Sequence, residues 1–145
     1  MAFSGNYMCT SFKVELLKGV HNFTPVTGST FKLALYDNTP TFTAATTAYT
    51  SVGEVPASGT YAAGGGVLTS ITPISSGTTA FVDFTDISFT SATITAYGAL
   101  IYNDSAPGKP AVCVLDFGGA KTSTNGTFTV IFPPDDVTTT ILRIV

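Results

Sequence analysis

The stretch that decides the fold reads TAYGALIYNDSAPGKPAVCVL at residues 95–115. Its two arms, residues 95–102 and 111–115, are apolar at consecutive positions, as in strands that are covered on both faces of a sheet. Residues 103–110 between them contain Asn, Asp, Ser, Gly and two prolines, which is typical of a turn. The sequence therefore predicts a long hairpin at the centre of a sheet.

Other short strands are predicted on both sides of this hairpin. Residues 30–36 alternate Phe31, Leu33 and Leu35 with less apolar side chains, which predicts a strand with one inner face. The remaining strands are expected at residues 67–72, 80–84, 87–89, 92–102, 111–117, 127–132 and 139–145, with a second hairpin turn at 121–126. This spacing predicts one mainly β domain over residues 1–145, an antiparallel β-sandwich of jelly-roll-like type.

Two segments depart from this pattern. Residues 10–20 place Phe12, Leu16, Leu17 and Val20 at helical spacing, with Thr10 or Ser11 as a possible cap, so one short amphipathic helix is expected. Residues 37–66 form a Thr- and Gly-rich excursion of thirty residues, too long for an ordinary connection. We expect it either to contact a partner or to fold back over its own domain.

The composition indicates a surface that neighbouring protein covers. Only 10% of the residues are charged, against about one quarter in a typical soluble domain, while 26 residues are threonine. Threonine suits a strand because its methyl group fits the pleat and its hydroxyl faces water. The six basic residues are scattered, which argues against nucleic-acid binding, and no apolar run reaches the length of a membrane span.

The termini and cysteines point to a protein made in the cytoplasm. Residues 1–6 lack a positive cluster followed by an apolar core, so we expect no cleaved secretory signal. Cys9 and Cys113 show no disulfide spacing and are expected to be buried thiols.

The inventory of reactive residues is too poor for an enzyme, so no catalytic residue is assigned. The single histidine, His21, could pair with a cysteine, but its place after the helix favours a structural role. Asp83 and Asp86 flank Phe84; the alternation places Asp83 on the solvent face and Asp86 at a strand break, where its side chain is expected to bond to backbone.

Cofactor and metal sites are not expected either. Asp135 and Asp136, together with Asp104 or Asp116, lack any calcium-loop spacing. The glycines at residues 64–66 lack the companion residues of a phosphate loop and are interpreted as a hinge or bulge.

Three parts of the chain resemble small structural proteins of tailed bacteriophages. They are FKVELLKGVHNF at residues 12–23 followed by TFKLALY at 30–36, the Thr-, Tyr- and Gly-rich excursion over residues 46–66, and AYGALIYN at 96–103. The resemblance covers most of the chain and implies a non-enzymatic virion component, without distinguishing capsid decoration from a head fibre or a tail part. It also implies a reason for the low charge, because copies packed in a shell cover one another.

The expected function is therefore that of a capsid cement or decoration protein, located in the virion and assembled in the host cytoplasm. Its expected partners are the major capsid protein or other virion proteins and further copies of itself. A trimer is expected, because closed cyclic trimers suit jelly-roll virion proteins and remove exposed strand edges. Glu54, Tyr61 and Tyr49 in the excursion are the candidate partner-interface residues.

Two other functions remain open. The first is a receptor- or glycan-binding module of a fibre or tail, which would use exposed tyrosines from the set Tyr36, Tyr49, Tyr61, Tyr97 and Tyr102. The second is a small hydrolase or isomerase, for which few suitable residues are present.

Overall fold

The hairpin predicted at residues 95–115 forms the centre of the structure. In the computed structural model, which describes residues 3–145, strands β6 (Ile87–Asn103) and β7 (Ala111–Val130) pair antiparallel, with Ala99 opposite Leu115 and Leu100 opposite Val114. Ala99, Leu100 and Val114 have no exposed surface. The expectation about a secretory signal rests partly on Met1 and Ala2, which lie outside the described residues.

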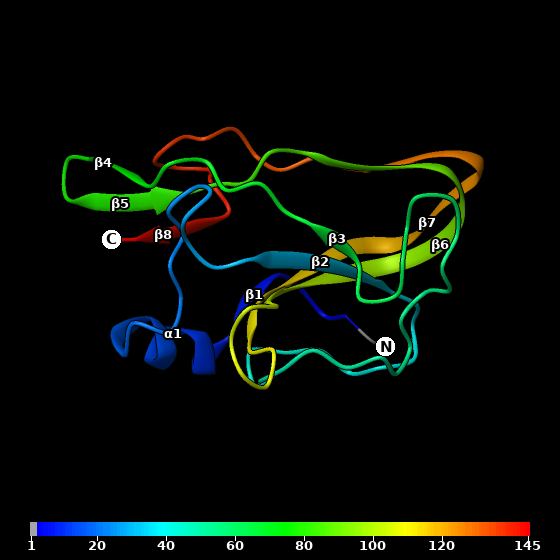
Figure 1. Cartoon of the computed structure of the whole chain (residues 1–145), viewed down its shortest axis with the longest axis horizontal. Helices are drawn as coiled ribbons and strands as arrows, with labels where there is room; N and C mark the ends of the chain where they lie inside the picture. The colour runs from blue at the N-terminus through cyan, green and yellow to red at the C-terminus, as the bar shows by residue number, and fades with distance from the viewer. Residues whose placement is uncertain (1–2) are drawn as a thin grey trace.

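Nine elements make up the described chain, and the protein is mainly β as predicted. A five-stranded antiparallel sheet has the order β1-β7-β6-β2-β3, in which β1 is Tyr7–Met8, β2 is Phe31–Tyr36 and β3 is Gly66–Val67. A three-stranded antiparallel sheet has the order β4-β5-β8, formed by Ile74–Ser76, Thr79–Val82 and Leu142–Ile144. It lies at the end of the molecule that also carries helix α1 (Thr10–Leu17), opposite the bend of β6 and β7 (Figure 1).

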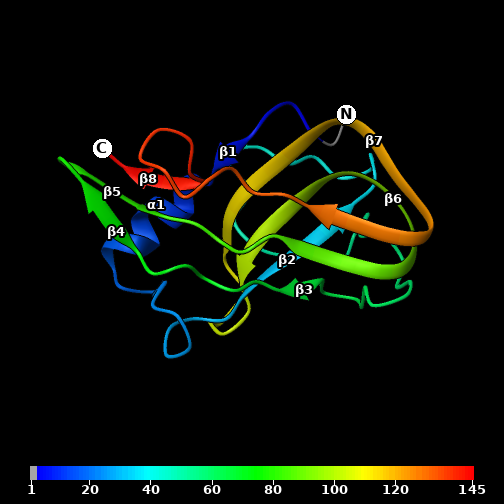
Figure 2. The ribbon, with the colours of Figure 1, turned by 90° about the horizontal axis from the view of Figure 1, so that it is seen from above.

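Strands β6 and β7 are much longer than predicted, and they bend together. The second hairpin turn expected at residues 121–126 is wrong: these residues belong to β7, where Lys121 pairs with Ala96 and Gly126 with Ala92. Register shifts interrupt the pairing at several places, and such bulges bend and twist a ribbon. The ribbon therefore turns over, so that its two halves lie in different layers (Figure 2).

Helix α1 is shorter than residues 10–20 and less amphipathic than its sequence suggests. It ends because Gly19 adopts a φ of 73°, with Gly19 N–H bonded to the Leu16 carbonyl and Val20 N–H to the Glu15 carbonyl. This pair of bonds is a Schellman cap. Phe12 is its one fully buried apolar side chain, whereas Leu17 is 91% exposed.

The excursion at residues 37–66 folds back over its own sheet, which was one of the two alternatives. Val55 N–H donates to the Leu35 carbonyl, Asp37 N–H to the Gly53 carbonyl, and Ala48 forms a bridge with Pro110. Every residue of β2 except the partly buried Lys32 is buried, so side chains on both faces of this strand are covered. The single inner face predicted for this strand is wrong for that reason.

Candidate functional site

The three predicted interface residues lie together in one polar cluster that ties the excursion to the sheet. The Tyr49 hydroxyl donates to Glu54 Oε2 at 2.6 Å, and the Tyr61 hydroxyl donates to Glu54 Oε1 at 2.8 Å. The N–H of Gly64 also donates to Glu54 Oε1, at 2.7 Å. We name these four residues the Glu54 cluster. One carboxylate thus accepts three hydrogen bonds from three residues of the excursion.

The Glu54 cluster continues into the centre of the sheet. The Tyr61 hydroxyl accepts the N–H of Leu35 at 2.9 Å, and the side chain of Tyr61 is 1% exposed. The Tyr102 hydroxyl donates to the carbonyl of Gly64, so the glycine turn is bonded on both of its sides. Tyr61 therefore stabilises the chain's own fold, and a partner could contact it only if the excursion opened.

In contrast to the buried Tyr61, and like Glu54, Tyr49 is half-buried. Its ring is half-buried and stacks on Tyr102, with centroids 4.7 Å apart, and the ammonium of Lys109 lies 5.4 Å from its centroid. Lys109 also pairs with Asp104 at 3.3 Å, and Lys32 pairs with the same carboxylate at 3.2 Å. A partner approaching this face would thus meet one aromatic ring bordered by two cations and one anion.

Burial keeps the hydroxyls of this region protonated. Desolvation raises the pKa of Tyr49 to about 12, with further contributions from its hydrogen bond to Glu54 and from that residue's charge. Desolvation also raises the pKa of Tyr61 and Tyr36, and the charge of Glu54 adds to the effect. For Asp104, burial opposes ionisation, but hydrogen bonds from Lys32 and Lys109 outweigh it and lower the pKa. The tyrosines therefore act as hydrogen-bond donors and are unsuited to base catalysis near neutral pH.

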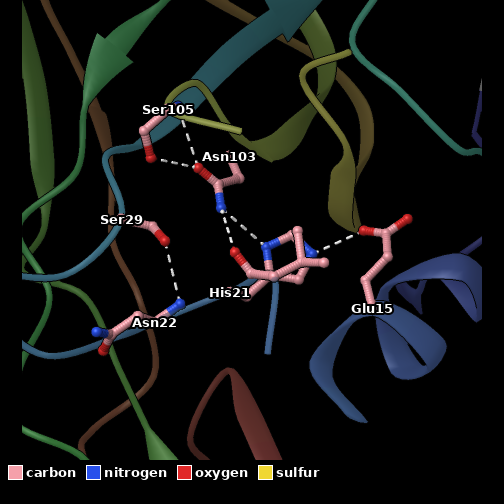
Figure 3. Close-up of polar contacts among 7 residues, drawn as sticks. Glu15, His21, Asn22, Ser29, Asn103 and Ser105 are labelled. Carbon is pink, nitrogen blue, oxygen red and sulfur yellow. Dashed lines mark hydrogen bonds and ion pairs between the residues drawn. The ribbon is translucent and has the colours of Figure 1, made fainter. Parts of the chain in front are cut away.

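His21 belongs to a second buried network, shown in Figure 3. Asn103 Oδ1 accepts two donors, Ser105 N–H at 3.1 Å and Ser105 Oγ–H at 2.7 Å. The Asn103 amide nitrogen therefore faces His21 Nδ1, at 3.1 Å, and donates to it. Since Nδ1 accepts, the proton of a neutral ring sits on Nε2 and is donated to Glu15 Oε2 at 2.7 Å.

This network supports the structural interpretation of His21. Its side chain has no exposed surface, and its ring packs against Phe12 and Phe31, with centroids 4.9 and 6.1 Å away. Both ring nitrogens are engaged by the chain itself. His21 thus joins α1 to the turn of the central hairpin, and a substrate has no access to it in this conformation.

The two cysteines are buried free thiols, as predicted. Desolvation raises the pKa of Cys9 to about 11, helped by the charge of Glu15, and desolvation raises the pKa of Cys113 as well. Because the thiolate is the nucleophile, both groups are poorly reactive at neutral pH.

The prediction that Asp83 faces solvent is wrong. Asp83 is 2% exposed, and its carboxylate accepts the N–H of Phe84 at 2.8 Å. The chain near Ser70 pairs with this segment through the Ser70–Phe84 bridge and a bond from Ile71 N–H to the Asp83 carbonyl, so the segment is not the free surface strand that the alternation suggested. Desolvation raises its pKa, against the lowering effect of that hydrogen bond. The prediction for Asp86 is confirmed, since its side chain accepts the backbone N–H of Phe132 at 2.8 Å.

No group of three or more metal-ligating side chains occurs among residues 3–145. Asp136 instead accepts the N–H and the hydroxyl of Thr138, each at 2.6 Å, and these hydrogen bonds lower its pKa. Residues 64–66, interpreted from the sequence as a hinge or bulge, form a closely packed turn, because a Cβ on Gly65 would overlap the backbone of Leu33.

Three surface features were not foreseen from the sequence. The first is an apolar hollow of about 140 Å³ between α1 and the three-stranded sheet, lined in part by Phe12, Leu16, Phe81 and Ile144. The second is a pair of hollows along β7, of about 410 and 350 Å³. The third is a set of large apolar side chains that are at least 48% exposed, namely Val14, Leu17, Val26, Val52, Val67, Ile74, Ile131, Ile144 and Val145.

Comparison of the chain with protein-family models, curated protein sequences and solved structures found no match. The described helix has eight residues, and no helix within residues 3–145 is long and apolar enough to cross a membrane.

Proposed function

We propose that this protein is a non-enzymatic structural component of a bacteriophage particle, most simply a capsid cement or decoration protein present in many copies. One observation carries the proposal: large apolar side chains are exposed over a surface that has very few charges. Ile74, Ile131 and Ile144 are 48%, 75% and 59% exposed, and residues 55–82 contain no charged side chain. Contiguous apolar surface marks contact with other protein, and the proposal takes these side chains as parts of such surface.

The reactive groups support the same proposal. His21 and both cysteines are buried in contacts that the chain makes with itself, and the tyrosines of the Glu54 cluster are bonded donors. This arrangement gives stiffness to the excursion, and a rigid surface binds with a smaller loss of conformational entropy. As part of the proposal, Tyr49 and Glu54 are the candidate contact residues within this cluster, since both are half-buried whereas Tyr61 is buried.

The mechanism is repeated burial of surface. A standard protein interface buries on the order of 1,600 Å² in total, and many symmetry-related copies convert a modest contact into resistance of the shell to internal pressure. We also assign the two antiparallel sheets to a jelly-roll-like sandwich whose open edges are completed by neighbouring protein. The expected partners are the major capsid protein and other copies of this chain.

The tyrosine distribution gives less support to a glycan-binding module. Tyr36, Tyr61 and Tyr102 are buried, so they cannot present ring faces to a sugar. Tyr49 and Tyr97 are only half-buried, but the ring of Tyr49 stacks on Tyr102 and not on Tyr97.

The test is to measure the copy number in purified particles. Particles from a lysate that contains this chain are purified by sedimentation, and the chain is quantified against the major capsid protein by mass spectrometry with labelled standard peptides. The proposal expects hundreds of copies per particle. A few copies would assign the chain to a fibre or tail, and its absence from particles would refute a virion role.

A further inference from the structure

Strand β7 has one edge without a strand partner over most of its length. It pairs with β6 on one side, whereas on the other side β1 reaches only Cys113 and Val114. Beyond that point, within residues 3–145, no strand pairs with this edge as far as Val130. Asn6 and Asp116 bond single N–H groups at its start. An unpaired edge is a template for another strand.

A recess lies beside this edge. The two hollows of about 410 and 350 Å³ share Phe117, Val130 and Ile131, so they are adjacent. The rings of Phe117 and Phe128 lie 6.3 Å apart and form an apolar wall, and Ile131 is 75% exposed. Added strands gain affinity from main-chain hydrogen bonds and specificity from pockets that receive alternate side chains. The recess therefore fits an extended strand better than a compact ligand.

The charge of the edge restricts the occupant. Residues 122–134 contain no charged side chain, although Lys121 lines one of the two hollows and Asp116 lines the other. A charged side chain inserted against residues 127–131 would lose hydration, and only Lys121 or Asp116 could offset its charge. An uncharged strand is complementary to this edge.

The chain itself carries such a strand at its other end. All three residues of β4 are exposed, β4 is an edge of its sheet, and residues 67–82 have no charge. The β4–β5 hairpin projects at the end opposite the bend of β6 and β7 (Figure 1).

We propose that β4 of one copy adds to the open edge of β7 in the next copy, with Ile74 entering the recess beside Ile131. The contact is head-to-tail, so repeated copies form a ring or an open filament according to the rotation between them. This deepens the proposed function by naming one partner, the chain itself. The inference can fail while the proposed function holds, because self-association of the chain is measured without any phage particle.

The test uses two single variants and their mixture. Ile131→Asp places a charge in the recess, and Ile74→Asp places a charge on the donor strand; both side chains are already exposed, so the fold is retained. Val52→Asp, at a site 63% exposed on the excursion, is the matched control. Sedimentation velocity and native mass spectrometry measure the assembly of each chain, and circular dichroism confirms folding.

We expect the unmodified chain and Val52→Asp to self-associate, and each of the two other variants to lose at least tenfold in association. Mixed together, they form a 1:1 heterodimer that grows no further, because each supplies the one site that the other retains. An unmodified chain that stays monomeric at high concentration overturns the inference. Association that neither variant weakens, or a mixture that stays monomeric, also overturns it.

Discussion

Replacement of Glu54 is the sharpest test of how the excursion is held. Glu54→Ala removes the acceptor of three hydrogen bonds, from Tyr49, Tyr61 and Gly64. The Tyr61 hydroxyl is buried, and an unsatisfied buried group costs about 1–3 kcal/mol. Tyr49 and Gly64 are half-buried and can bond to water, at a net loss of about 0.5–1 kcal/mol each. The sum predicts a loss of about 3 kcal/mol in the free energy of unfolding.

Glu54→Gln is the matched control. The Gln carbonyl can occupy the position of Oε1, where it keeps the bonds from Tyr61 and Gly64, and the Tyr49 hydroxyl can rotate to accept from the new amide. The expected loss is then only about 1 kcal/mol, from the lost charge assistance. Equilibrium urea unfolding, followed by tyrosine fluorescence and circular dichroism, measures both variants. A loss below about 1 kcal/mol for Glu54→Ala, or equal losses for the two variants, would refute this account of the cluster.

Four further predictions follow from the structure. Gly65→Ala should lower the free energy of unfolding by about 2–4 kcal/mol, because the added Cβ overlaps the Leu33 backbone and the residue must keep a φ of +87°. Gly108→Ala, at φ +78° in open space, should lower it by only about 1 kcal/mol in the same urea assay. Similar losses for the two variants would contradict the close packing of the turn. Neither Cys9 nor Cys113 should react with a thiol reagent in the folded chain, and both should react in urea; rapid labelling of the native protein would show that the thiols are accessible. The melting temperature should fall as the pH rises above about 10. In that range the unfolded chain ionises its tyrosines, whereas burial keeps Tyr36 and Tyr61 protonated in the folded state. A melting temperature that stays constant to high pH would contradict this prediction. Nitrogen NMR should find the proton of the neutral His21 ring on Nε2, and a proton on Nδ1 would reverse the assigned donor and acceptor roles. Asn103→Ala should lower the free energy of unfolding by about 2–3 kcal/mol, because it removes the donor to His21 Nδ1.

The centre of the fold could be predicted from the sequence because its signal is local. The apolar run at residues 95–115 has a turn in its middle, and that pattern predicts the β6–β7 hairpin directly. The position of α1 was predictable for the same reason, although its last residues were not: the left-handed conformation of Gly19 ends it early.

The extent and bending of the ribbon could not be predicted. Asn125 and Gly126 look like a hairpin turn, and Asn125 does adopt a positive φ of 44°, but it does so inside a strand that continues to Val130. A hairpin turn and a β-bulge favour the same residue types, Asn and Gly, so only the pairing of β7 with β6 shows which of the two is formed here. The pairing of the Asp83 segment likewise depends on the chain near Ser70, which no local pattern brings there.

The candidate site was predicted as a group of residues, but its geometry was not. Glu54, Tyr61 and Tyr49 were singled out because they are the polar and aromatic residues of a loose excursion, and they do lie together. That they bond to one another follows from how the excursion folds over β2, which is a long-range property. The open edge of β7 had only one signal in the sequence, the absence of charge over residues 122–134.

The central claim is that neighbouring protein covers this hydroxyl-rich, weakly charged surface in an assembled particle. The most direct test of this claim is to measure amide hydrogen exchange in the free chain and in the same chain within purified particles. We predict that the amides of β4 and of the β7 edge exchange at least tenfold more slowly in the particle. Unchanged exchange at both sites, or a chain that never sediments with particles, would contradict the claim.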